Sequence, residues 1–222
     1  MGVLLMLMTI GGLFVAVILL VAASLTRKAW LAKFTIGGVA VWLGFYAVLL
    51  VGFSMASKTR VLEVGQAKEF CGFYLDCHMH VEMTGVRTSK SLGDRVATGK
   101  FYLVGLRVFS DAKNPNIAFR LIQPNAVIPV GDESLIRRDV AAEATLPSAG
   151  VDLGREIKGR QTIEKEIVFD VPEDLRDPKL HVVEGYGIDN TLEAVLIDDE
   201  DSILHARTFF DLREQTDTAG VK

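Results

Sequence analysis

The first part of the chain lacks charged side chains almost completely. Residues 3–25 and 34–56 are two apolar runs without a single Asp, Glu, Lys, Arg or His. Buried helices of soluble proteins rarely stay this apolar beyond about 14 residues, whereas a helix across the roughly 30 Å hydrocarbon core of a bilayer needs about 20. Lipid offers no partner for backbone amides, so each run must be helical. We therefore predict a transmembrane helical hairpin over residues 1–58, with helices at about 3–25 and 34–56 and the lipid bilayer as partner.

The hairpin also lacks the features of a cleaved signal and of a transport path. A cleaved signal has a basic start and a short apolar stretch, but here the basic residues follow the first run. Ionisable groups inside a membrane mark ion and proton paths, and neither run contains one. We therefore expect an uncleaved, plain anchor.

Charge between the two runs predicts the orientation. Arg27, Lys28 and Lys33 lie there without an accompanying acid. Short loops rich in Lys and Arg stay in the cytoplasm, so these three residues are the expected topology determinants. They predict an integral protein of the cell membrane whose C-terminal domain is extracytoplasmic. Lys58 and Arg60, which follow the second run, act against this orientation.

The rest of the chain lacks catalytic motifs and an excess of basic charge. It contains neither the Gly-x-Ser-x-Gly pattern of a nucleophilic serine nor a glycine-rich phosphate loop. Five of the 24 basic residues precede Val61 but none of the 28 acidic residues does, which leaves 24 − 5 = 19 basic and 28 acidic residues beyond the hairpin. Such a surface does not attract nucleic acid. We expect no catalytic residue, no cofactor and no nucleic-acid partner.

Short runs of β-forming residues alternate with turn signals beyond the hairpin, which is typical of an antiparallel sandwich. Alternate residues of the clearest strand are apolar and should share one face: Tyr102, Val104, Leu106 and Val108. The expected strands are residues 61–64, 81–86, 101–110, 117–122, 126–130, 156–170, 179–185, 192–197 and 203–212.

The same patterns predict the boundaries of this part of the chain. A short helix is expected near residues 138–144 and a polar loop over residues 88–99. We expect one all-β domain over residues 59–213, because nothing inside it resembles a linker or a repeat. Residues 214–222 are polar and small, and we expect a flexible tail there.

Two segments resemble those of a known family. Residues 100–109 read Lys-Phe-Tyr-Leu-Val-Gly-Leu-Arg-Val-Phe, and residues 159–162 are followed by Ile-Val-Phe-Asp-Val-Pro at 167–172 and Pro-Lys-Leu at 178–180. They are similar to the hallmark strand and the late strand of a bacterial family of immunoglobulin-like extracytoplasmic domains of unknown function, related to secreted immunoprotective antigens. The resemblance covers roughly residues 61–185. It implies an immunoglobulin-like fold, often tethered to a membrane, and supplies no catalytic residue.

Cysteine is scarce, since Cys71 and Cys77 are the only two. Disulfides persist outside the cytoplasm. Six residues of straight strand would span about 20 Å, far more than the roughly 4.4–6.8 Å between bridged Cα atoms, so a bridge requires residues 72–76 to form a loop. We expect the disulfide, while two buried thiols and metal ligation remain alternatives.

Two of the four histidines follow the second cysteine. His78 and His80 share one strand face, and they are candidate ligands for zinc or copper. His181 or His205 could add a ligand only if the fold brings it close. The interpretation that we favour leaves His78 and His80 in solvent or in ordinary hydrogen bonds. The acidic run at residues 198–202 lacks the spacing and the glycine of a calcium loop, and we interpret it as a solvated turn.

Three functional hypotheses follow. The first is a non-enzymatic, membrane-tethered binding or scaffold module, which recognises a protein or another cell-envelope component by strand addition or loop contacts. The second is a metal-binding or redox module that uses Cys71, Cys77, His78 and His80. The third is an accessory subunit of a larger membrane complex. The sequence does not define the oligomeric state.

Overall fold

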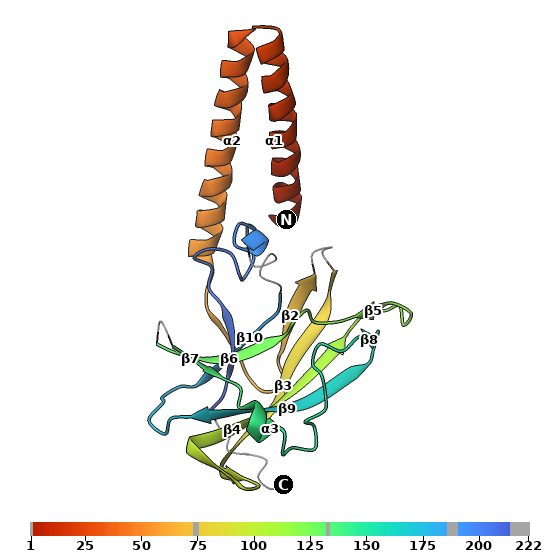
Figure 1. Ribbon diagram of the computed structural model, residues 1–222, viewed down its shortest axis with the longest axis vertical. Coiled ribbons are helices and arrows are strands. Elements are labelled where there is room, and N and C mark those ends of the chain that lie inside the picture. The colour runs from red at the N-terminus through yellow and green to blue at the C-terminus, as the bar shows by residue number, and fades with distance from the viewer. Residues whose placement is uncertain (1, 73–75, 132–133, 186–190, 214–222) are drawn as a thin grey trace, which may run out of the picture. The chain divides into compact units, whose positions relative to one another are not determined.

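The computed structural model describes residues 2–72, 76–131, 134–185 and 191–213 (Figure 1). The chain divides into two compact units: Met1–Thr59 with Gly187–Arg207, and Arg60–Tyr186 with Thr208–Lys222. The first unit contains the two apolar helices and the second contains the β-sheets. The expected boundaries of the β-domain, 59–213, thus enclose a segment that the structure groups with the helices.

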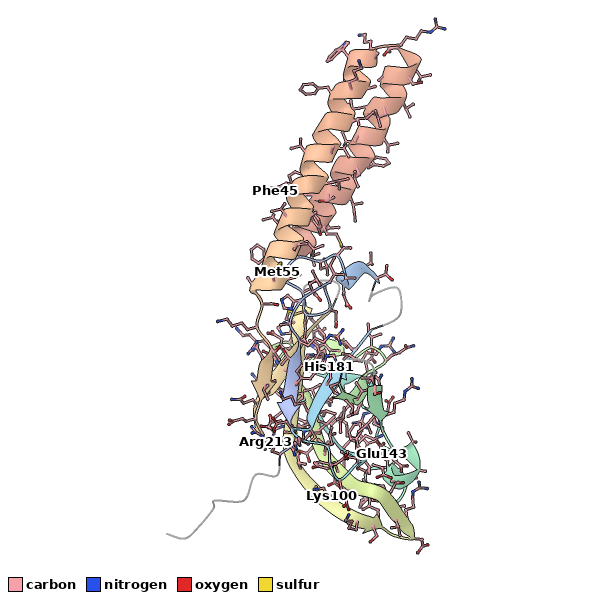
Figure 2. The ribbon with its side chains drawn as sticks, turned by 90° about the vertical axis from the view of Figure 1, so that its left-hand side faces the viewer. Phe45, Met55, Lys100, Glu143, His181 and Arg213 are labelled. Atoms are coloured by element: carbon pink, nitrogen blue, oxygen red, sulfur yellow. A yellow bond between two sulfur atoms is a disulfide. The ribbon has the colours of Figure 1, made fainter. Side chains whose placement is uncertain are left out.

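The first unit is built on a helical hairpin of α1 (Gly2–Leu25) and α2 (Ala29–Ala56). Four of the five buried residues of α1 lie seven positions apart, namely Gly2, Thr9, Ala16 and Ala23. The indole Nε1 of Trp42 donates a hydrogen bond to Thr9 Oγ1 at 3.0 Å. Most apolar side chains, such as Phe45 and Met55, are exposed instead (Figure 2). Both helices are long and apolar enough to cross a membrane. The second begins earlier than expected, so that it includes Lys33.

Residues 191–207 complete the first unit as a run of turns. A helical turn over residues 191–193 is followed by bends and turns, so the strand expected at 192–197 is wrong. Leu196 and Ile197 are buried, and this apolar pair therefore reflects packing within the unit and not strand pairing. Of the strand expected at 203–212, only β11 (Thr208–Asp211) forms.

The second unit is a sandwich of two main sheets. One has the order β1-β11-β10-β6-β7 and the other the order β2-β3-β4-β9. Pairing is antiparallel except between β1 and β11. A two-stranded sheet pairs β5 (Ala118–Phe119) with β8 (Ile157–Lys158). The strands of the main sheets are β1 (Arg60–Leu62), β2 (Ala67–Gly72), β3 (Asp76–Leu92), β4 (Arg95–Ser110), β6 (Asn125–Val130), β7 (Ser134–Arg137), β9 (Thr162–Val171), β10 (Lys179–Val183) and β11.

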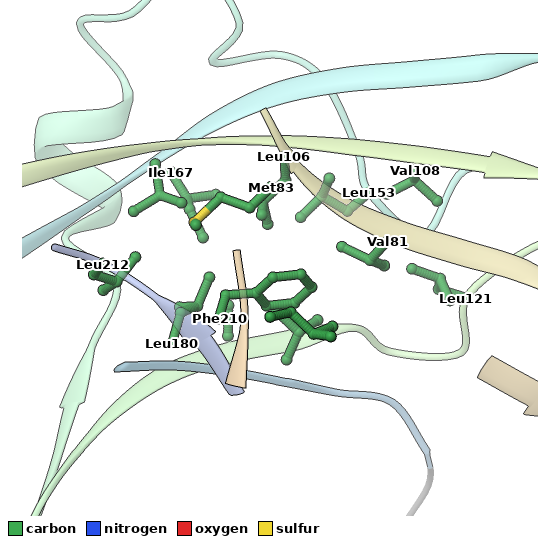
Figure 3. Close-up of a cluster of buried hydrophobic side chains, with 14 of the residues drawn as sticks. Val81, Met83, Leu106, Val108, Leu121, Leu153, Ile167, Leu180, Phe210 and Leu212 are labelled. Atoms are coloured by element: carbon green, nitrogen blue, oxygen red, sulfur yellow. The ribbon is translucent and has the colours of Figure 1, made fainter. Parts of the chain in front are cut away.

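The core of the sandwich lies between the two main sheets. Met83, Leu106 and Ile167 from one sheet face Leu180 and Phe210 from the other (Figure 3). The four alternate residues of β4 that were expected to share a face are all buried in this core, which confirms that prediction.

The opposite face of β4 is covered as well. Phe101 and Leu103 pack with Val168 of β9 in a second buried cluster. Ala142 of α3 (Val140–Glu143) belongs to the same cluster, so the helix expected near residues 138–144 is confirmed. The side chain of Asp139 caps it by accepting the N–H of Ala142 at 2.9 Å. This part of the four-stranded sheet is therefore buried on both faces.

Three other expectations about the strands need correction. Residues 88–99 are not a polar loop, because β3 and β4 pair as far as Leu92 and Arg95 across a two-residue turn that begins at Gly93, with φ +56°. The strand expected at 156–170 is interrupted at Arg160, which adopts φ 67°. Only two residues of the strand expected at 117–122 pair with a neighbour, as β5.

Candidate functional site

The outward face of β3 and β4 brings together the polar side chains that could act on a ligand. His78, His80 and Glu82 alternate along β3 with residues of the core. The register pairs His80 with Phe109 and Glu82 with Arg107, and opposite residues of antiparallel strands share a face. The histidines predicted as candidate ligands therefore lie on one face, as the alternation requires.

The carboxylate of Asp111, just after β4, contacts both histidines. His78 Nδ1 lies 2.7 Å from Asp111 Oδ1, and His80 Nε2 lies 3.5 Å from Asp111 Oδ2. An ionised carboxylate only accepts hydrogen bonds, so Nδ1 of His78 donates. This hydrogen bond lowers the pKa of Asp111, with a further contribution from His80, against a smaller opposing effect of burial.

A stacked array extends the cluster along the sheet. The imidazole of His80 stacks on the ring of Phe109, with 5.0 Å between centroids and 16° between planes. The guanidinium of Arg107 lies 5.7 Å from the centroid of the same ring and pairs with the nearly buried carboxylate of Glu82. The face thus presents the exposed imidazole of His78 and the carboxylate of Asp111, with the largely covered imidazole of His80 stacked on Phe109 beside them.

A disulfide joins Cys71 of β2 to Cys77 of β3, with 3.9 Å between their Cα atoms. The expected bridge is therefore present; residues 73–75, which link the two strands, lie outside the described residues. One carboxylate oxygen of Glu69 and the two sulfur atoms lie within 4.8 Å of one another. Metals bind thiolate sulfur, and the bonded sulfurs are not thiolates. Ligation by Cys71 and Cys77 would first require reduction of the bridge.

The other candidate residues lie elsewhere. His181 is buried in β10 of the other sheet, with its ring 5.2 Å from that of Phe209. His205 lies in the first unit, where its Nδ1 is 2.8 Å from the carbonyl oxygen of Ala206. In the described part of the chain, neither joins a group of three possible metal ligands with His78 and His80.

The acidic run at residues 198–202 forms a turn in the first unit. Asp199 accepts the backbone N–H of Asp201 through its side chain at 2.9 Å and that of Ser202 through its carbonyl oxygen at 3.1 Å. Burial raises the pKa of the Asp199 carboxyl.

The expected topology determinants lie at the turn between α1 and α2. Arg27 and Lys28 form the turn between the helices, Lys33 lies near the start of α2, and all three are exposed.

Sequence reasoning found the histidines but missed Asp111, Phe109 and Arg107. The register of β3 and β4 could have revealed them, because pairing residues 78–82 with residues 107–111 places all of these side chains together.

Comparison with known proteins gives similarity to solved structures alone. No family model matches the chain, and no curated protein matches it. The secreted protein MPT63 of Mycobacterium tuberculosis is 12% identical, with a TM-score of 0.41 over 70% of this chain and 97% of that chain. An uncharacterized β-sandwich protein from Clostridium difficile 630 is 8% identical, with a TM-score of 0.29 over 71% of this chain and 97% of that chain. At this similarity, the assignment of a β-sandwich depends on the strand order and the core described above.

Proposed function

We propose that the chain is a membrane-anchored protein that displays an immunoglobulin-like binding or scaffold domain outside the cytoplasm. The observation that carries this proposal is the apolar surface of the hairpin. In the two most apolar stretches of the helices, 17% and 6% of the residues are buried. A core helix of a soluble protein would be covered by the rest of the chain, whereas a lipid-facing helix needs no such cover.

The disulfide supports the extracytoplasmic location. Disulfides form and persist in oxidising compartments and are rare in the cytoplasm, and the Cys71–Cys77 bridge belongs to the β-sandwich. The exposed cations Arg27, Lys28 and Lys33 at the turn of the hairpin support the same orientation, because short basic loops remain inside.

The two edges of the four-stranded sheet differ in a way that favours one docking edge. At β9 the carbonyl oxygen of Val168 accepts the N–H of Asp139 at 2.7 Å, and the N–H of Val168 donates to Glu143 at 3.2 Å. The N–H of Glu166 donates to Ser148 Oγ at 3.1 Å. This edge is therefore already bonded within the chain.

The opposite edge, β2, has one strand neighbour, β3, and carries the exposed residues Ala67 and Glu69. It is longer than the edge strands β1 and β7 of the other sheet. An extended partner segment that adds to β2 would be separated from the His78–Asp111–His80 cluster by β2 itself, because Glu69 of β2 pairs directly with His80 of β3.

Orientation is tested by labelling thiols on intact cells with an impermeant maleimide. We expect Cys71 and Cys77 to react from outside only after treatment with an impermeant reductant. Ala29→Cys, placed at the hairpin turn in a chain with both native cysteines replaced by serine, should react only after permeabilisation. The reverse pattern would overturn the orientation, and reaction of the native thiols without reductant would argue against a stable bridge.

The docking edge is tested by placing a photo-crosslinking amino acid at Glu69 or, as the matched control, at Glu164. Both residues are exposed on the outward face, Glu69 on β2 and Glu164 on β9, two residues before the bonded Glu166. We expect a cross-linked product in cells from Glu69 and none from Glu164. Equal cross-linking from both positions would contradict recognition by strand addition at β2.

A metal or redox role is a second candidate, favoured by the contact of Asp111 with both imidazoles. His78, His80 and Asp111 offer nitrogen and oxygen ligands that suit zinc or copper, but their ligand atoms do not all lie within 4.8 Å of one another. Cys71 and Cys77 would join them only after reduction. Calorimetric titration with zinc separates this role from the first. Binding that His80→Ala abolishes and His181→Ala retains would support it, and heat exchange that His80→Ala leaves unchanged would exclude these ligands.

The role of an accessory subunit makes a separate prediction. It requires a membrane partner that remains bound to the hairpin in mild detergent. Purification of the chain alone under those conditions would count against it.

A further inference from the structure

Residues 191–207 are fastened to one face of α2 over several helical turns. The hydroxyl of Tyr46 donates to the carbonyl oxygen of Val195 at 2.7 Å, and Ser54 Oγ lies 3.2 Å from Ser202 Oγ. Ser57 Oγ accepts the N–H of Ala206 at 2.7 Å. Tyr46, Leu50 and Ser54 are four residues apart and thus share a helical face, and Leu50 and Ser54 are the buried residues of α2.

The same segment reaches the start of α1. An added Cβ at Gly2 would lie 2.1 Å from the carbonyl oxygen of Ile197, so the helix and the segment are in direct backbone contact there. Gly2 and Met6, one turn apart, are buried, as are Leu196 and Ile197. Both helices therefore have residues 191–207 against the ends that lie opposite the basic turn.

The helices are longer than a bilayer core requires. At 1.5 Å per residue, the 24 residues of α1 and the 28 residues of α2 measure about 36 and 42 Å, against a core of roughly 30 Å. Trp30, beside the basic turn, is exposed, as expected for an aromatic residue at an interface. From Trp30 to Tyr46 is about 24 Å along the axis, so Tyr46 and its bonded Val195 lie near the far boundary of the core.

Residues 191–207 expose apolar side chains of their own. Val195, Ile203 and Leu204 are all exposed. Leu204 is 71% exposed and has φ 64°, a conformation that favours glycine. Nothing in the described part of the chain covers most of this large apolar side chain, although the backbone at its position favours glycine. We take the presence of leucine there to indicate a contact outside the chain.

The backbone of this segment suits the headgroup boundary. Its turns are bonded internally, for example from Leu196 N–H to the carbonyl oxygen of Glu193 at 2.9 Å and from Ile203 N–H to that of Ala194 at 3.0 Å. Irregular backbone is not exposed to lipid in the hydrocarbon region, whereas the interface accommodates it. The acidic residues 198–201 of the same segment also require contact with water or headgroups.

From these observations we propose that residues 191–207 are a third membrane-contacting element, which lies in the interface beside the hairpin and inserts Val195, Ile203 and Leu204 among the lipids. The proposal rests on the membrane anchor proposed above. The exposed apolar surface of α2 includes Val48, which lies two residues beyond Tyr46 and therefore on another face of the helix.

The test places an environment-sensitive fluorophore on a single added cysteine in the full chain, with the native bridge intact, in phosphatidylcholine vesicles. The positions are Leu204, Val48 as the hairpin reference and Asp198 as the exposed polar control of the same segment. We expect brominated lipids to quench the probe at Leu204 at shallow depth and the probe at Val48, and aqueous iodide to quench the probe at Asp198. The ratio of lipid to iodide quenching should be at least about tenfold higher at Leu204 than at Asp198.

Each other outcome has a defined meaning. Quenching by lipid at Val48, together with iodide quenching at Leu204 equal to that at Asp198, would overturn the proposal and leave the anchor intact. Protection of Leu204 from both quenchers would mean that protein covers it, which would also overturn the proposal. Absence of lipid quenching at Val48 would instead reject the anchor itself.

Discussion

The hairpin and the sandwich contain the same kinds of apolar side chains but leave them in opposite environments. In the sandwich, Phe169 and Leu106 are 0% and 1% exposed. In the hairpin, Phe34 and Val41 are 79% and 75% exposed. Removal of apolar surface from water stabilises a fold by about 25 cal/mol per Å², and few side chains of the hairpin are covered in this way by the rest of the chain. A sequence shows that a residue is apolar, but only the fold shows whether other residues cover it.

Polar groups of the two regions also differ in where along the chain their partners lie. The hydroxyls of Thr9, Thr26 and Thr35 donate to carbonyl oxygens four residues earlier in the chain, a common arrangement for threonine in helices. On the sandwich, charged groups instead pair across strands, as Arg87 does with Glu166 at 3.0 Å. These three threonine hydroxyls donate to the preceding helical turn, whereas the charge pairs of the sandwich depend on the register of the sheet.

The largest expected effect comes from a cavity in the sandwich. Phe169→Ala should lower the free energy of unfolding of the sandwich by about 3–5 kcal/mol, because Phe169 is fully buried between the sheets. The measurement is amide hydrogen exchange of the full chain in nanodiscs. Both tryptophans, Trp30 and Trp42, lie in the hairpin, so tryptophan fluorescence follows the hairpin separately and should not change.

Phe45→Ala is the matched control for that substitution, because the same side chain is exposed on α2. It should leave the stability of the sandwich within about 0.5 kcal/mol of the original value. A loss comparable to that of Phe169→Ala would mean that the sandwich depends on the surface of the hairpin, and the contrast between the two regions would fail.

The elements that the sequence predicts well are those whose signal is local. The helices follow from uncharged length, and the faces of β4 follow from the alternation around Leu106. The ends of β3 and β4 were missed because residues such as Lys90 and Arg95 face solvent there and leave no apolar alternation.

Elements that depend on a distant partner are missed for another reason. The apolar pair Leu196 and Ile197 resembles part of a strand, but it packs within the helical unit. The His78–Asp111 contact joins residues 33 positions apart, and only the register of two strands reveals it. The candidate site could thus be half predicted: its histidines follow from spacing, and its carboxylate requires the fold.

A charge placed in each exposed apolar region sharpens the comparison further. Val41→Arg, near the middle of α2, should disfavour membrane insertion by about 2.5–3.5 kcal/mol. Val96→Arg, at an equally exposed position in β4 of the sandwich, should have almost no effect. The measurement is the fraction of the chain that resists alkaline extraction from membranes. Equal extraction of both variants would show that exposure on the hairpin does not mean contact with lipid.

The smallest expected effect concerns a carboxylate of the sandwich that has no counterpart in the hairpin. Asp170 accepts the N–H groups of Thr98 and Gly99 at 2.8 and 3.0 Å. Burial acts to raise the pKa of this carboxyl, but these hydrogen bonds together with the charge of Arg95 outweigh it and lower the pKa below its ordinary value of 3.8. The contribution of Asp170 to stability is therefore complete above that ordinary value and is lost as the pH falls through the lowered pKa.

Asp170→Asn should remove this share of the acid sensitivity. At neutral pH we expect a loss of about 1 kcal/mol, near the low end for a charged acceptor because the carboxylate is partly exposed. The loss should shrink as the pH is lowered from about 5 to below the ordinary value of 3.8, because the native carboxyl takes up its proton as the pH falls through its lowered pKa. Asp111 and Asp211 also have lowered pKa values, so the variant should retain part of the acid slope. Hydrogen exchange at both pH values measures the difference, and a loss independent of pH would show that the side chain acts through its shape and not through its charge.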